Sequence, residues 1–202
     1  NITVVEDSAE SLGAEYNGTH TGTFGLLGAF SFNGNKTITC GGGGCIVTND
    51  ESLAKKAKHL TTTAKVPHRW AYKHDQVGYN YRLPNINAAL ACAQLEQLPK
   101  FLDNKRKLAS EYAQAFEHIE SVDFFTEKTG TKANYWLNTI LLNNIEERNK
   151  FLEQTNNAGV MTRPVWELMS ELEMFKHFKS DDLSVSKWLA ERIVNIPSSV
   201  RI

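Results

Sequence analysis

The chain has 202 residues and a net charge of −1, with 41% hydrophobic and 22% charged residues. This composition is typical of a globular protein with one domain or two small ones. The near-neutral charge gives no reason to expect a nucleic-acid partner, and no apolar run approaches the roughly 20 residues that cross a bilayer. The cysteines Cys40, Cys45 and Cys92 form no disulfide framework and the histidines show no metal spacing, so we expect a cytoplasmic protein without a metal.

The first predicted element is a buried strand at Ile2–Val5, because three of its four residues are apolar and β-branched. Glu6 and Asp7 follow at its carboxyl end, where ligands bind in open α/β sheets. The carboxylate of Asp7 could cap the next turn or bind a ligand, and both interpretations remain open at this point.

A second predicted strand, Ala29–Phe32, leads into a polar loop that carries Lys36, and four glycines follow at Gly41–Gly44. A lysine at a strand end among partly desolvated neighbours can act as an amine nucleophile, typically by a Schiff base with a carbonyl substrate or with pyridoxal phosphate. Asp7 could then pair with the pyridine nitrogen of that cofactor, and the Ser31 hydroxyl could reach its phosphate. The alternative is a solvated lysine beside a tight glycine turn.

The remaining elements suggest a change of organisation after about residue 117. The first region continues with a strand, a helix capped by Asn49 or Asp50, and two helices separated at Pro99, over Cys45–Thr48, Asn49–Leu60, Asn85–Leu95 and Phe101–Glu117. The second region alternates strands and helices, over Ser121–Thr126, Asn134–Leu142, Asn144–Asn156, Gly159–Thr162 and Leu183–Arg192. We expect Trp136, Trp166 and Trp188 in its core and a solvated basic surface at Lys105–Lys107.

Four blocks in order carry a resemblance: Glu6–Ala14, Thr21–Gly25, Ser31–Gly44 and Val77–Ala89. Together they resemble the DegT/StrS family, pyridoxal-phosphate-dependent aminotransferases that act on nucleotide-linked keto sugars. Within the family, segments of the chain are most similar to the LegC-like branch: His59–Lys65, Asn134–Asn138 and Val194–Arg201.

The resemblance implies an α/β fold of the fold-type-I aminotransferase class. Residues 1–117 would be the C-terminal part of the large mixed-sheet domain with its linking helix, and residues 118–202 a small α+β C-terminal domain. The chain would then be a fragment, since family members are much longer.

Site residues follow from the same resemblance. Lys36 would bond covalently to the cofactor, Asp7 would pair with its ring nitrogen, and Glu10 would lie near the ring. Ser31 would bind the phosphate, and Asn80 would reach the phosphate held by the neighbouring subunit of a homodimer. Two arginines, Arg163 and Arg201, are candidates for substrate anions, although a capping role is as reasonable for each.

The implied reaction places an amino group at C4 of a UDP-linked 4-keto-6-deoxy-N-acetylhexosamine, with glutamate as donor, for bacillosamine- or legionaminic-type sugars. Two alternatives remain. The first keeps the fold and cofactor but has another sugar substrate or reaction. The second is a regulatory or scaffold relative without turnover, and intact Lys36, Asp7, Ser31 and Asn80 argue against it.

Overall fold

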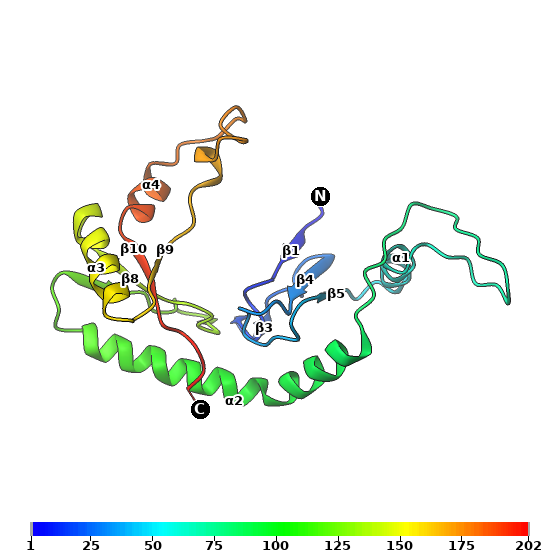
Figure 1. Cartoon of the computed structure of the whole chain (residues 1–202), viewed down its shortest axis with the longest axis horizontal. Helices are drawn as coiled ribbons and strands as arrows, with labels where there is room; N and C mark the ends of the chain where they lie inside the picture. The colour runs from blue at the N-terminus through cyan, green and yellow to red at the C-terminus, as the bar shows by residue number, and fades with distance from the viewer. Residues whose placement is uncertain (1, 202) are drawn as a thin grey trace. The chain divides into compact units, whose positions relative to one another are not determined.

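The computed structural model describes residues 2–201, and the chain divides into two compact units. Unit 1 comprises residues 1–103 and 128–134, and unit 2 comprises residues 104–127 and 135–202. The long helix α2 (Asn85–Phe116) belongs to both, so the division falls inside the helix, whereas the sequence predicts a boundary after it, at residue 117 (Figure 1).

The sheet of unit 1 has three strands in the order β1–β4–β5, over Val5–Asp7, Leu27–Ser31 and Gly44–Val47. Strand β1 pairs with β4 in parallel, and β5 pairs with β4 antiparallel. Because the carboxyl ends of parallel strands lie at one edge, the residues after β1 and those after β4 are neighbours. A second small sheet is formed by β2 (Glu15–Tyr16), β3 (Thr19–His20) and β7 (Thr131–Lys132).

The prediction of a buried strand at Ile2–Val5 is wrong in both position and burial. The strand begins at Val5, and the side chains of Ile2, Val4 and Val5 are exposed. The physical reason is the strand order: β1 is an edge strand, and no other strand of the described chain pairs with its free side.

Two glycines allow β4 to approach the preceding loop. A Cβ atom on Gly28 would lie 2.0 Å from the carbonyl oxygen of Gly22, a distance that no side chain tolerates. Gly22 itself has a φ of +87°, which favours glycine. Behind this strand, the core of unit 1 consists of Phe32, Ile38, Cys40 and Ala91.

The helices of unit 1 confirm one prediction from the sequence, the cap of α1, and contradict another, the interruption at Pro99. Helix α1 (Glu51–Thr61) begins after Asp50, whose carboxylate accepts hydrogen bonds from the backbone of Ser52 and Leu53 at 2.8 and 3.0 Å, so the predicted cap is confirmed. The predicted interruption at Pro99 is wrong, because α2 continues through it. One proline removes a single helix hydrogen bond, and the contacts of the neighbouring Leu98 and Phe101 with the core favour the continuous helix.

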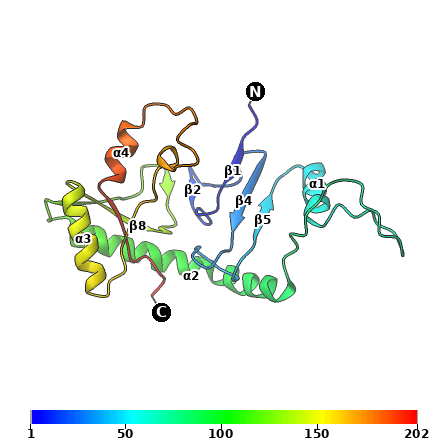
Figure 2. The same cartoon turned by 45° about the horizontal axis from the view of Figure 1, so that its top comes forward.

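Unit 2 is built on an antiparallel sheet in the order β6–β8–β10–β9, over Val122–Phe124, Asn138–Leu142, Ile193–Ile196 and Arg163–Pro164. Helix α3 (Ile145–Asn157) packs on β8 and β10, and the chain then forms a short 3-10 helix, Met169–Glu171, and α4 (Ser184–Ala190) (Figures 1 and 2). The core of the sheet is apolar: Ile140, Leu142, Val194 and Ile196.

Several expectations for unit 2 are corrected. The strand predicted at Gly159–Thr162 is a loop, and the strand lies just after it at β9. The side chains of Trp166 and Trp188 are 64% and 47% exposed, so these tryptophans do not fill the core. Trp166 instead stacks on Trp136 with ring centroids 6.0 Å apart. The core positions belong to β8 and to β10, and β10 is a strand that the sequence interpretation missed.

No helix in the described part of the chain is long and apolar enough to cross a membrane. Within residues 2–201, no three histidine, cysteine or acidic side chains gather where they could hold a metal ion.

Candidate functional site

The carboxyl edge of β1 and β4 brings together the first group of predicted site residues. Asp7 ends β1 and lies opposite Ala29 of β4, while Ser31 ends β4 two residues later. The backbone N–H of Ser8 donates to the carbonyl of Ala29 at 2.9 Å and extends the pairing past the strand end. The parallel pairing therefore places the Asp7 carboxylate and the Ser31 hydroxyl at the same edge of the sheet.

The two adjacent acids at the end of β1 have different roles. The carboxylate of Glu6 accepts hydrogen bonds from the backbone N–H groups of Gly22 at 2.7 Å and Gly25 at 2.5 Å, and the bond from Gly25 contributes most to lowering its pKa. Glu6 therefore fixes the loop before β4. Asp7 is exposed, and its Oδ1 accepts from the N–H of Ala9 at 3.2 Å. Its other oxygen, Oδ2, has no partner among residues 2–201 and is available to a ligand.

Lys36 lies close to Glu10. The Lys36 ammonium donates a hydrogen bond to Oε1 of Glu10, and the lysine side chain is only 12% exposed. Its backbone N–H donates to the carbonyl of Asn33 at 3.1 Å, which closes a turn just after β4. The structure thus brings the predicted catalytic amine to the loop that follows β1, where Asp7 also lies.

A buried asparagine holds these two loops together, and the sequence interpretation gave it no role. The side-chain N–H₂ of Asn134 donates to the carbonyls of Glu10 and Leu12 at 2.7 and 3.0 Å, and to the hydroxyl of Thr37 at 3.3 Å. Asn134 thereby ties the Glu10 loop to the residue after Lys36. Nothing in its local sequence distinguishes it from a surface asparagine, so only the structure identifies it.

The glycine run after Lys36 forms a turn that the backbone itself requires. Gly41 and Gly43 have φ values of +85° and +96°. A Cβ atom on Gly44 would lie 2.2 Å from the carbonyl oxygen of Phe30. Each of these three positions favours glycine because of the way the chain connects β4 to β5. The need for a tight turn therefore explains these glycines without a bound ligand.

Asn80 lies in a different part of unit 1. It forms an antiparallel bridge with Thr62, and its side-chain oxygen accepts a hydrogen bond from Arg82 at 3.2 Å. Both views show the loop between α1 and α2 reaching away from the β1–β4–β5 sheet (Figures 1 and 2). The backbone hydrogen bonds of Tyr79 and Tyr81 to Leu60 and Thr61 place Asn80 where this loop returns, at the end of α1. The described contacts of Asn80 are thus with its own segment, and the chain by itself does not bring it to Lys36.

The two candidate substrate arginines both lie in unit 2 and have protein partners there. Arg163 donates to the side chain of Asn156 at 3.3 Å and to the carbonyl of Thr162 at 3.2 Å. Arg201 forms an ion pair with Glu111 at 2.8 Å, which raises the pKa of the guanidinium. These contacts suit the capping interpretation, and a role in binding substrate remains a prediction.

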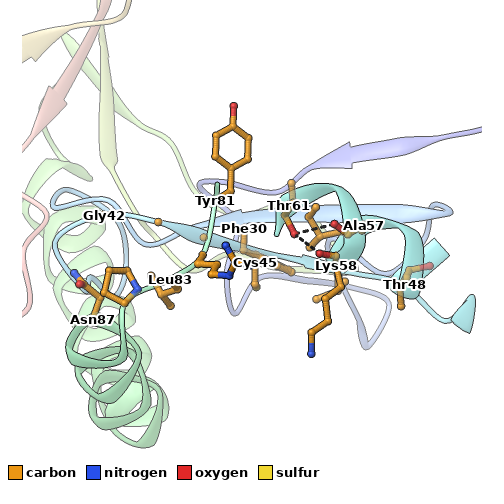
Figure 3. Close-up of a pocket in the computed structure, with 18 of the residues that line it drawn as sticks. Phe30, Gly42, Cys45, Thr48, Ala57, Lys58, Thr61, Tyr81, Leu83 and Asn87 are labelled. Atoms are coloured by element: carbon orange, nitrogen blue, oxygen red, sulfur yellow. Dashed lines mark hydrogen bonds between the residues drawn. The ribbon is translucent and has the colours of Figure 1, made fainter. Parts of the chain in front are cut away.

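A hollow of about 950 Å³ lies on unit 1 between β4, β5, α1 and the start of α2. Asp7, Ser31 and Lys36 do not line it. In Figure 3 the ring of Tyr81 and the amine of Lys58, two of its lining residues, point in opposite directions, and the Thr61 hydroxyl donates to backbone carbonyls of α1. This hollow is therefore separate from the edge where the predicted catalytic residues gather.

Comparisons with known proteins place this geometry in context. Relatives include EpsN of Bacillus subtilis strain 168, named as a candidate pyridoxal phosphate-dependent aminotransferase, at 37% identity over 98% of the chain and 52% of the relative. GDP-perosamine synthase of Escherichia coli O157:H7 is 38% identical over 98% of the chain and 53% of its own length. The chain thus spans about half the length of these relatives.

Among solved structures, Helicobacter pylori PseC, an aminotransferase involved in the biosynthesis of pseudoaminic acid, superposes with a TM-score of 0.93 at 23% identity. The match covers 99% of this chain and 55% of PseC, and it confirms the predicted fold class. The family and its solved members indicate pyridoxal phosphate as the cofactor. The DegT/DnrJ/EryC1/StrS aminotransferase family matches residues 1–202, and the chain therefore belongs to this family.

Proposed function

We propose that the chain is part of a pyridoxal-phosphate-dependent aminotransferase for a nucleotide-linked keto sugar and supplies its reactive lysine. The observation that carries the proposal is the contact between the Lys36 ammonium and Glu10, beside the strand edge that ends in Asp7 and Ser31. An amine, carboxylates and a hydroxyl converge there on loops fixed by backbone hydrogen bonds.

The donor set fits pyridoxal phosphate group by group. The aldehyde requires an amine, which Lys36 provides. The protonated ring nitrogen requires a carboxylate oxygen, and Asp7 has Oδ2 available. The phosphate requires donors. Ser31 Oγ accepts from the N–H of Asn33 at 3.3 Å, so its own O–H proton is left to donate to an anion.

The residues of the chain would act on protons and on orientation. The bound cofactor supplies an electron sink that allows an amino group to be exchanged for a ketone. The Asp7 carboxylate would pair with the ring nitrogen and favour its protonated form, which maintains that capacity. The Lys36 amine would accept and return a proton during the exchange. Glu10, already in contact with Lys36, positions the amine for this transfer.

The finer assignment rests on resemblance and on the relatives' names. We propose a homodimer in the cytoplasm, where free thiols such as those of Cys40, Cys45 and Cys92 persist, with Asn80 reaching the cofactor phosphate of the partner subunit. The substrate would be a UDP-linked 4-keto-6-deoxy-N-acetylhexosamine aminated at C4, with glutamate as donor, as in the LegC-like branch. The GDP-perosamine synthase relative makes a GDP-linked sugar the direct competitor.

The test is to locate the covalent bond to the cofactor in the full-length protein. Borohydride reduction of the protein loaded with pyridoxal phosphate, followed by peptide mass analysis, should find the cofactor on Lys36. Lys36→Ala and Lys36→Arg should both abolish the cofactor absorbance band and the transfer from glutamate, because a guanidinium cannot replace the amine. Lys58→Ala is the matched control and should retain both.

Two results would contradict the proposal. One is a reduced cofactor found on another lysine, and the other is near wild-type turnover by Lys36→Ala. Parallel assays with UDP- and GDP-linked 4-keto sugars decide the nucleotide: faster amination of the GDP-linked sugar would reject the finer assignment and leave the coarser one intact.

A further inference from the structure

We propose that Arg82 is a positioning residue, which turns the side-chain amide of Asn80 so that its N–H₂ group faces a phosphate. The inference rests on the proposed function, in which Asn80 binds the cofactor phosphate. To that proposed site it adds Arg82, together with a physical reason for its effect: the side-chain amide of Asn80 is already oriented before the phosphate binds.

The backbone around Asn80 is held firmly against the end of α1. The N–H groups of Tyr79 and Tyr81 donate to the carbonyls of Leu60 and Thr61 at 2.7 and 2.9 Å, and the N–H of Thr63 donates back to Tyr79 at 2.9 Å. The rings of Tyr79 and Tyr81 stack with centroids 5.1 Å apart. These contacts on both sides of Asn80 fix the position of its Cα, so only the side chain remains to be oriented.

Arg82 supplies that orientation through two nitrogens. Nη1 donates to Oδ1 of Asn80 at 3.2 Å, and Nη2 donates to the backbone carbonyl of Thr62 at 3.1 Å. Thr62 is also the residue that pairs with Asn80 in the backbone bridge. The guanidinium therefore joins the two partners of the bridge, and its own direction is set by the Thr62 carbonyl.

The chemistry of the groups decides which end of the amide is free. A guanidinium has donors and no acceptor, so it can meet only the oxygen of an asparagine side chain. With Oδ1 held by Arg82, the two N–H donors of Nδ2 are directed elsewhere. A phosphate offers only acceptors at its oxygens, and it is the N–H₂ end that suits it. An amide turned the other way would present an oxygen to the anion and repel it.

A lysine at position 82 separates positioning from simple charge. Arg82→Lys keeps a positive charge near the phosphate but lacks the planar fork that bonds Asn80 and Thr62 together. Arg82→Gln removes the charge as well. Arg69→Gln is the matched control, because Arg69 lies in the same segment beside the ring of Trp70 and has no described bond to Asn80.

The experiment measures dissociation constants of two probes, pyridoxal phosphate and pyridoxal, which lacks the phosphate, for the full-length protein. Arg82→Lys should weaken binding of pyridoxal phosphate by about tenfold, the value of one hydrogen bond to a charged group. It should leave pyridoxal binding unchanged, and it should have no further effect in an Asn80→Ala background. Arg69→Gln should change neither constant.

Other results overturn the inference. If Arg82→Lys binds pyridoxal phosphate as wild type does while Arg82→Gln does not, Arg82 acts by charge alone. If both substitutions weaken the two probes equally, or add to Asn80→Ala, the effect is not orientation of Asn80. Unchanged pyridoxal binding also shows that each variant is folded. If the wild-type protein forms no bond between Lys36 and either probe, the proposed function itself fails. This outcome is distinct from a failure of the inference about Arg82, because that failure is seen only in the Arg82 variants.

Discussion

Lys105 should make the stability of unit 2 depend on pH in the alkaline range. It is 4% exposed, and its ammonium donates to the backbone carbonyls of Ser198 and Trp136. Burial lowers the pKa of Lys105 from 10.5 to about 8, because the charged form loses its hydration. Between these two values the unfolded chain binds more protons than the folded protein. The free energy of unfolding therefore rises as the pH increases from about 8 to 10.5.

The size of the rise follows from the shift. A difference of about 2.5 pKa units corresponds to an upper limit of about 3.4 kcal/mol over the full range. The two carbonyl acceptors favour the charged form and reduce this value. Between pH 7.5 and 9.5 we therefore expect the contribution of Lys105 to rise by about 1–2 kcal/mol. Measurements should stop there, because burial raises the pKa of Tyr112, whose ionisation on unfolding lowers stability at higher pH.

The assay is urea unfolding of the protein and of Lys105→Met, followed by tryptophan fluorescence at several pH values. A Trp70→Phe background confines the signal to unit 2, which contains the other three tryptophans. The stability of wild type relative to Lys105→Met should increase with pH by the amount given above. A difference between the two proteins that stays constant from pH 7.5 to 9.5 would refute the reasoning, since Tyr112 and all other groups are common to both.

Three further outcomes are expected. Asp7→Asn should leave cofactor binding measurable but reduce the transamination rate by orders of magnitude, because an amide cannot keep the ring nitrogen protonated; equal rates would return Asp7 to a capping role. Gly28→Ala should lower the melting temperature by about 6–12 °C, through roughly 3 kcal/mol of overlap with the Gly22 carbonyl, and an unchanged value would contradict the close approach. Mixed Lys36→Ala and Asn80→Ala proteins should regain up to about a quarter of wild-type activity after subunit exchange, if the site is shared across a two-fold dimer; no gain would place Asn80 within its own chain.

The local signals in the sequence were sufficient for much of unit 1. A cap residue before a run of helix-forming residues placed α1, and apolar strands ending in polar loops placed β4 and β5. The edge that brings Asp7 and Ser31 together follows from parallel pairing of β1 with β4. The contact of Lys36 with Glu10 could not be read from the sequence, because it depends on the path of two loops held by Asn134.

Unit 2 was less predictable because tertiary packing decided its core. The strand β10 has three β-branched residues, Ile193, Val194 and Ile196, and such residues favour a strand. The strand follows directly after the predicted helix Leu183–Arg192, so the short run was not recognised as a separate element. Tryptophan was a poor guide, since a large ring with a polar edge is stable half exposed. Lys105 was expected on a solvated basic surface, yet its neighbours along α2 gave no sign that Ser198 and Trp136 would enclose it.

The bare side of β1 has a consequence for handling the protein. An edge strand presents a row of unpaired backbone groups. Here Val5, the first residue of β1, is 63% exposed, and the preceding Ile2 and Val4 are 93% and 55% exposed. Such a strand is a template on which a second molecule can add by β-pairing. The 202-residue chain, purified by itself, should therefore form aggregates whose onset depends steeply on concentration, and a charged substitution such as Val4→Lys should raise the concentration at which turbidity appears.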